Sequence, residues 1–156
     1  MEFERISRDE MLMAIAHQYA RRSTCSRARV GAVAARYGRV VVGSYNGAPA
    51  GMPHCNHFCD CPASDGSTGT HWEHCASVQP CLVSVHAEAN AIAWTSRVGG
   101  KLEGTELFTT LAPCVNCAML IINAGIRRVV MAKPYRDPAG VELLQVAGVR
   151  VSELDV

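Results

Sequence analysis

Two short motifs place metal-binding side chains at the starts of two segments with helical patterning. His86-Ala87-Glu88 opens one segment, and Pro113-Cys114-Val115-Asn116-Cys117 opens the other. An imidazole and two thiolates are good zinc ligands, and three protein ligands leave the fourth position of a tetrahedral site for water. The positive end of a helix dipole favours thiolates at Cys114 and Cys117. The sequence therefore predicts an open zinc site formed by His86, Cys114 and Cys117.

Glu88 lies two residues after the predicted ligand His86, so its carboxylate can lie beside the metal without binding it. Zinc lowers the pKa of bound water to about 7, and Glu88 would move the protons of that water. General acid–base catalysis of this kind contributes roughly 10²- to 10⁴-fold. The competing interpretation is a structural zinc site or a histidine satisfied in the core. A structural site usually has four protein ligands, which favours the catalytic interpretation.

The first half of the chain predicts one helix and a β-hairpin. Ser7-Arg8-Asp9-Glu10 matches a capping box, and apolar residues at helical spacing extend the helix to about Arg22. Val30 to Arg36 and Arg39 to Tyr45 are apolar stretches on either side of a Tyr37-Gly38 turn.

The second half alternates between helix and strand patterns. Helices are expected over 86–97, 113–125 and 137–147, and strands over 106–110, 127–132 and 149–152. Pro113 is expected in the first turn of its helix. A strand, a crossover helix and another strand imply parallel neighbours. We therefore expect one mixed sheet with helices on both faces, and the two motifs at one edge of it.

The bulk composition excludes several classes of function. The chain has 156 residues, of which 49% are hydrophobic, enough for the core of one domain spanning 1–156. A formal net charge of +1 gives no broad basic surface for nucleic acid or membrane. The charged N-terminus and the absence of a long apolar run predict a soluble, cytoplasmic protein.

Residues 50–81 differ from the rest of the chain, because they hold four of the six histidines and five of the eight cysteines and show no apolar periodicity. Cysteines clustered with histidines in a reducing compartment indicate metal rather than disulfides. We interpret this segment as an insertion within the domain that a second zinc ion orders, because a polar loop buries too little to order itself. A partly ordered loop with free thiols is the alternative.

The two motifs, in this order and joined by one strand, resemble the signature of zinc-dependent deaminases. From Arg5 to Glu153 the chain is similar to the cytidine and deoxycytidylate deaminase superfamily, above all to bacterial and phage deoxycytidylate (dCMP) deaminases. The resemblance rests on the stretches 23–25, 30–32, 45–51, 86–92 and 122–126. It implies a three-layer α/β/α fold with a mixed five-stranded sheet whose last two strands are parallel. It also implies hydrolysis of dCMP to dUMP and ammonia, which supplies thymidylate synthesis.

The resemblance assigns substrate contacts as well. Asn46 would contact the sugar and the main chain of Ala87 the base, although Asn-Gly is also a turn signal. The substrate phosphate requires a cation or a helix N-terminus. Arg27 and Arg29 are the candidates for the phosphate, with solvation as the alternative, and Tyr135 is a further candidate for the nucleotide pocket.

For the second zinc, the resemblance favours Cys25, Cys55, Cys61 and Cys81, with competition from other histidines and cysteines of the insertion. It further implies a homo-oligomer, with a hexamer favoured, and regulation by dCTP and dTTP. Arg97 could serve an effector, a subunit interface or only solvent.

Three other functions remain open. One is a deaminase of a base in tRNA or another polynucleotide, against which the near-neutral charge counts. Another is a deaminase of a modified deoxycytidylate, a free nucleoside or a free base. The third is a zinc-dependent interaction module, which would have no need of Glu88 beside an open metal site.

Overall fold

The computed structural model describes residues 5–25, 28–52, 54, 84–154 and 156, and all that follows concerns this part of the chain. Arg27 and most of the predicted insertion, with Cys55, Cys61 and Cys81, lie outside the described residues. The elements, in chain order, are α1 Arg8–Ala20, β1 Gly31–Arg36, β2 Arg39–Tyr45, α3 Ala87–Arg97, β3 Glu106–Thr109, α4 Val115–Asn123, β4 Arg128–Met131, α5 Ala139–Val146 and β5 Arg150–Glu153.

Helix α1 begins with the predicted capping box. The Ser7 hydroxyl accepts a hydrogen bond from the Glu10 amide at 3.1 Å, and the Glu10 carboxylate accepts one from the Ser7 amide at 2.6 Å. The helix ends at Ala20, and the predicted last residue, Arg22, lies in the turn that follows.

Strands β1 and β2 form the predicted hairpin. Arg36 pairs with Arg39, so the connection has two residues, Tyr37 and Gly38, with φ of 54° and 74°. Positive φ at both positions gives the turn a twist that matches the twist of the flanking strands.

The five strands form one sheet in the order β2-β1-β3-β4-β5. Strand β1 is antiparallel to both β2 and β3, whereas β3, β4 and β5 are mutually parallel. The predicted mixed sheet with parallel final strands is therefore confirmed. The strand and helix ends differ from those predicted by one or two residues.

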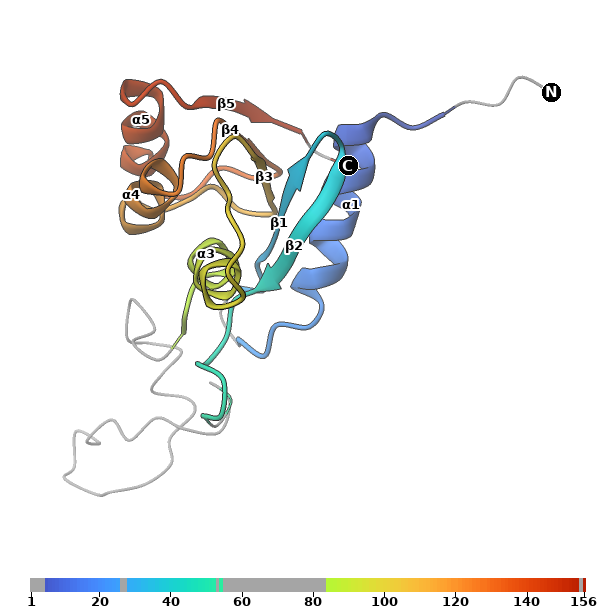
Figure 1. Ribbon diagram of the computed structural model, residues 1–156, viewed down its shortest axis with the longest axis vertical. Helices are drawn as coiled ribbons and strands as arrows, with labels where there is room; N and C mark the ends of the chain where they lie inside the picture. Colours follow the sequence, from blue (N-terminus) through green and yellow to red (C-terminus); the bar gives the residue numbers. More distant parts are fainter. Residues whose placement is uncertain (1–4, 26–27, 53, 55–83, 155) are drawn as a thin grey trace.

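Figure 1 shows α1 alone on one face of the sheet and α3, α4 and α5 on the other, which confirms the three layers. Leu12, Met13 and Ala16 of α1 pack against Phe108 and Val130. The opposite core gathers small and branched side chains, which are Ala32, Ala91, Leu107, Ala118, Ile121, Val129 and Leu144. No helix in the described part of the chain is both long and apolar enough to cross a bilayer.

The segment that follows β2 and the segment that precedes α3 pair with each other. Gly47 and Val85 form an isolated antiparallel bridge, with N···O distances of 3.1 and 2.9 Å. The bridge holds the residues that follow β2 next to those that precede α3.

Candidate active site

The fold brings the starts of α3 and α4 together at one edge of the sheet. His86 is the N-cap of α3 and Cys114 the N-cap of α4, and neither side chain caps its own helix by a hydrogen bond. Cys117 lies in the first turn of α4. The prediction that Pro113 opens this helix is wrong, because α4 begins at Val115 and Pro113 precedes the extended N-cap.

The three predicted ligands lie together. Nδ1 of His86 is 3.5 Å from Sγ of Cys114 and 3.5 Å from Sγ of Cys117. A tetrahedral zinc ion at its usual Zn–N and Zn–S distances would hold nitrogen and sulfur about 3.6 Å apart. Among the described residues these three form the one group of such side chains placed to hold a metal ion. The donor set and its spacing therefore fit zinc.

The charges of the group also fit a divalent cation. A hydrogen bond from Cys117, and another with His86, lower the pKa of Cys114 to about 3. The pKa of Cys117 is raised, first by its hydrogen bond to Cys114 and then by burial. The bond with Cys114 raises the pKa of His86. The two thiols thus share one negative charge, and a cation between them would stabilise both as thiolates.

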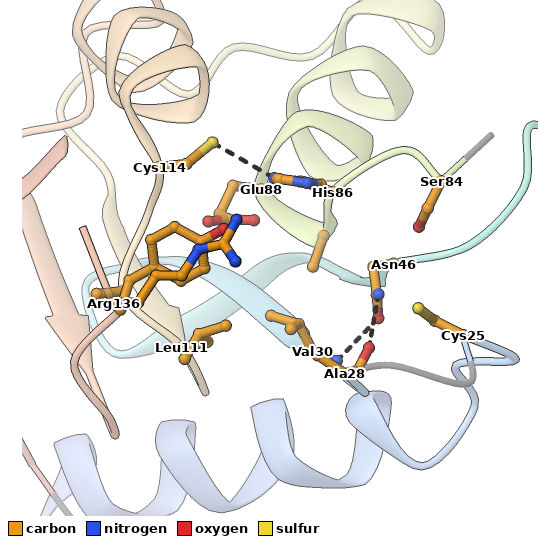
Figure 2. A pocket seen from close by; sticks show the side chains of 13 residues that line it. Cys25, Ala28, Val30, Asn46, Ser84, His86, Glu88, Leu111, Cys114 and Arg136 are labelled. Atoms are coloured by element: carbon orange, nitrogen blue, oxygen red, sulfur yellow. Dashed lines mark hydrogen bonds between the residues drawn. The ribbon is translucent and has the colours of Figure 1, made fainter. Parts of the chain in front are cut away.

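Glu88 lies in the first turn of α3 and is 3% exposed. Burial raises its pKa to about 7. A carboxyl group whose pKa is near neutrality can both accept and donate a proton at physiological pH, as a general acid–base catalyst must. Figure 2 shows Glu88 beside His86 and Cys114, facing the same cavity.

This cavity has a volume of about 360 Å³, within the range of small-molecule sites. His86 and Cys114 line it, whereas Cys117 does not, so the open side of the metal site faces the cavity. The full lining is Cys25, Ala28, Val30, Asn46, Ser84, His86, Ala87, Glu88, Leu111, Ala112, Cys114, Tyr135 and Arg136. Of the predicted substrate residues, Asn46, Ala87 and Tyr135 are therefore at the cavity.

Other predicted residues lie elsewhere. Arg29 is exposed and does not line the cavity, although it stands just before β1. Arg97 ends α3, where its guanidinium lies 5.7 Å from the centre of the Trp94 ring, also away from the cavity. Cys25 is buried and lines the cavity, and its predicted zinc partners are not described.

Asn46 is buried and holds the chain that enters β1. Its Oδ1 accepts a hydrogen bond from the Val30 amide, and its Nδ2 donates one to the Ala28 carbonyl, both at 2.8 Å. Its own carbonyl accepts a bond from the Ser23 hydroxyl at 2.9 Å. The hairpin turn is at Tyr37-Gly38, so Asn46 is not a residue of that turn.

Ala87 ties α3 to the sheet, because its carbonyl accepts a hydrogen bond from the Ser44 hydroxyl of β2 at 2.7 Å. The amide of Ala87 belongs to the first turn of α3, whose N–H groups have no acceptor within a helix. This amide is thus a suitable donor toward a ligand in the cavity.

Two polar residues of the lining, Ser84 and Arg136, were not among the residues predicted from the sequence. The hydroxyl oxygen of Ser84 is buried and has no hydrogen-bond partner in the described part of the chain. Nothing in the sequence around Ser84 signals this. The Arg136 guanidinium lies 5.6 Å from the centre of the Tyr135 ring, and only its adjacency to Tyr135 could have indicated it.

The comparisons with known proteins agree with this geometry. Residues 6–133 match the family model described as the cytidine and deoxycytidylate deaminase zinc-binding region. The chain is 39% identical over 154 residues to ComE operon protein 2 of Bacillus subtilis, covering 98% of this chain and 74% of that protein. It is 40% identical over 126 residues to the deoxycytidylate deaminase of Mycobacterium phage D29, covering 80% of this chain and 94% of that protein.

Among solved structures, the dCMP deaminase of cyanophage S-TIM5, in complex with dCMP and dUMP, superposes with a TM-score of 0.77. The two chains are 29% identical, and the match covers 97% of this chain and 100% of the phage chain. The family model spans most of the sequence and includes both motifs. The chain therefore belongs to the cytidine and deoxycytidylate deaminase family of zinc-binding proteins.

Proposed function

We propose that this protein hydrolyses dCMP to dUMP and ammonia. The observation that carries the proposal is the buried Glu88 beside a three-ligand His86, Cys114 and Cys117 site, of which Glu88, His86 and Cys114 line one nucleotide-sized cavity. Relatives named deoxycytidylate deaminase, and a structural neighbour solved with dCMP and dUMP, support the choice of substrate.

One zinc ion, held by His86, Cys114 and Cys117, would supply a water that ionises near neutral pH. Cys117 is 2% exposed, so it would anchor the ion from behind, while His86 and Cys114 leave the cavity side open. The three ligands come from the first turns of two helices whose positive ends favour the thiolates.

Glu88 moves the protons of the reaction. It accepts a proton from the attacking water as the oxygen bonds to C4 of the base, and it delivers that proton to ring N3. It then carries the second water proton to the exocyclic amine. The C4–N bond breaks, ammonia leaves, and a carbonyl remains at C4. The pKa of Glu88, near 7, suits a carboxyl group that both accepts and donates a proton during the reaction.

The neighbouring main chain orients the substrate. The Ala87 amide donates to the base, and Asn46 presents its remaining amide hydrogen and lone pair to the sugar. The bonds that fix Asn46 to Ala28 and Val30 keep its side chain in one orientation before the substrate arrives. Such preorganisation reduces the entropy lost on binding.

We further propose that the chain forms a single domain over 1–156 and that a second zinc uses Cys25 with Cys55, Cys61 and Cys81. Buried Cys25 supports this, because it lines the cavity and would place the second ion next to the substrate site. A cytoplasmic homo-oligomer, with a hexamer favoured and with dCTP and dTTP as effectors, stays a prediction.

The test is an assay of zinc-loaded protein against dCMP, dCTP, deoxycytidine and a cytosine-containing oligonucleotide, followed by the loss of cytosine absorbance. Turnover of dCMP, abolished in Glu88→Gln, is expected. Turnover of the oligonucleotide alone would favour the polynucleotide deaminase instead. A zinc-loaded protein inactive on every cytosine substrate would contradict the proposal.

A further inference from the structure

Ser84 carries a buried hydroxyl that faces a ligand-sized space. The residue lines the cavity, yet its hydroxyl oxygen is buried and forms no hydrogen bond in the described part of the chain. Nearly all buried polar groups in proteins are hydrogen-bonded, so each exception requires an explanation. Ser84 takes no part in the proton transfers of Glu88. The explanation that fits its place in the cavity is a hydrogen-bond partner supplied by the ligand.

The bridge between Gly47 and Val85 directs Ser84 into the cavity. These two residues exchange both of their backbone hydrogen bonds, so Asn46 lies opposite His86 in the antiparallel pair. Side chains alternate along extended chain, so Ser84 and His86 point to the same side as Asn46. Figure 2 shows all three at the same cavity. Ser84 is thus a diagonal neighbour of Asn46 across the bridge.

Asn46 and Ser84 are separated by a gap that one small polar group can span. Diagonal neighbours across an antiparallel pair are about 7–8 Å apart. The side-chain bonds of Asn46 go to Val30 and Ala28. Two hydrogen bonds of about 2.8 Å in series cover most of such a gap. The remaining amide hydrogen and lone pair of Asn46, together with the Ser84 hydroxyl, therefore suit a group that both donates and accepts a hydrogen bond.

A hydroxyl group has this capacity, and the sugar of dCMP carries a single one, at C3′, because its 5′-oxygen is esterified and C2′ bears only hydrogen. We infer that the Ser84 hydroxyl, together with Asn46, binds the 3′-hydroxyl of the substrate. Ser84 precedes His86 by two residues, so this bond fixes the distance from the sugar to the metal site. The inference rests on the proposed function, which places the sugar beside Asn46.

The experiment compares the wild type and Ser84→Ala, each with dUMP and with 2′,3′-dideoxyuridine 5′-monophosphate, which lacks only the 3′-hydroxyl. Calorimetry on zinc-loaded protein measures the four dissociation constants. The loss of one neutral hydrogen bond predicts that Ser84→Ala weakens the binding of dUMP by about 2- to 10-fold. The dideoxy compound should bind to Ser84→Ala as tightly as to the wild type or more tightly, because it leaves a buried Ser84 hydroxyl unpaired.

Turnover provides a second measurement of the same bond. The kcat/KM for dCMP should fall in Ser84→Ala by the factor found for dUMP binding, whereas the kcat/KM for 2′,3′-dideoxycytidine 5′-monophosphate should not fall. Ser96→Ala is the matched control, because it removes the same hydroxyl from an exposed residue of α3 away from the cavity. This control should behave as the wild type with every compound.

An equal loss for both uridine monophosphates in Ser84→Ala would overturn the inference, because the hydroxyl would then support the fold or a bound water rather than the sugar. A wild type that binds both compounds with the same affinity would also overturn it. A wild type that binds neither compound would contradict the proposed function, and the inference would fall with it.

Discussion

Gly140 of α5 packs directly on the main chain of Cys114, so closely that a Cβ atom at position 140 would lie 2.7 Å from the Cys114 carbonyl carbon. It would also overlap the carbonyl oxygen of Pro113. Backbone cannot yield as a flexible side chain does. The helix that follows β4 therefore determines where the N-cap of α4, and with it one candidate zinc ligand, can lie.

This contact predicts that Gly140→Ala weakens zinc binding by about 10-fold or more, as changes next to metal ligands commonly do. The measurement is zinc affinity by competition with a chromophoric chelator. Val146→Ala, on the exposed side of the same helix, is the control and should bind zinc normally. Unchanged affinity in a folded Gly140→Ala protein would show that α5 does not position Cys114.

Ser44→Ala should destabilise the start of α3. The Ser44 hydroxyl donates to the Ala87 carbonyl at 2.7 Å in a buried setting, and losing a buried partner costs about 1–3 kcal/mol. Because Ala87 lies between His86 and Glu88, we also expect a lower kcat at saturating dCMP. Chemical denaturation and steady-state kinetics together check this. A stability loss with unchanged kcat would leave Ser44 with a purely structural role.

The raised pKa of Glu88 makes the stability of the metal-free protein depend on pH. Its folded pKa is about 7 and its ordinary value is 4.5, so the folded state holds the proton more tightly than the unfolded state. Stability associated with this proton is present below the ordinary value and is lost as the pH rises through 7. Glu88→Gln should therefore be the more stable protein above about pH 7, by up to about 3 kcal/mol.

The advantage of Glu88→Gln should shrink as the pH falls toward 4.5. Urea denaturation of both metal-free proteins over this interval measures it. A constant difference at all pH values would mean that burial does not perturb the carboxyl group.

Zinc binding should release close to one thiol proton at about pH 8. In the metal-free site Cys114 is ionised because its pKa is lowered to about 3, whereas the pKa of Cys117 is raised and it keeps its proton. Ligating thiols must be deprotonated, so metal entry expels the proton of Cys117. Calorimetry in buffers of different ionisation enthalpy counts the protons. Release of two thiol protons would show that Cys114 is protonated before the metal binds.

Much of the site could be predicted because its metal ligands and Glu88 lie in two short contiguous motifs. His86 and Cys114 begin helices that follow the sheet, and helices after parallel strands start at the same sheet edge. The exact helix start could not be predicted. Pro113 suits a first helical turn in general. Here Cys114 is an extended N-cap against which Gly140 packs, and α4 begins only at Val115.

Arg136 shows where local patterns stop being informative. It falls between the strand expected over 127–132 and the helix expected over 137–147, which indicates only a loop, and a loop arginine is ordinarily solvated. That it lines the cavity depends on the segment after β4 lying beside the segment after β3, where the Ala112 amide donates to the Lys133 carbonyl at 2.8 Å. Arg29 illustrates the converse, because adjacency to β1 did not bring it to the cavity.

The bridge between Gly47 and Val85 bears on how this family can diversify. Its two hydrogen bonds fix the chain on both sides of the intervening stretch, one residue from Asn46 and one from His86. Closing a longer loop costs only slightly more entropy, about 0.6 kcal/mol for each doubling of its length. The stretch between residues 47 and 85 can therefore change in length over evolution, or by grafting, at little cost in entropy, while the bridge keeps Asn46 and His86 in place.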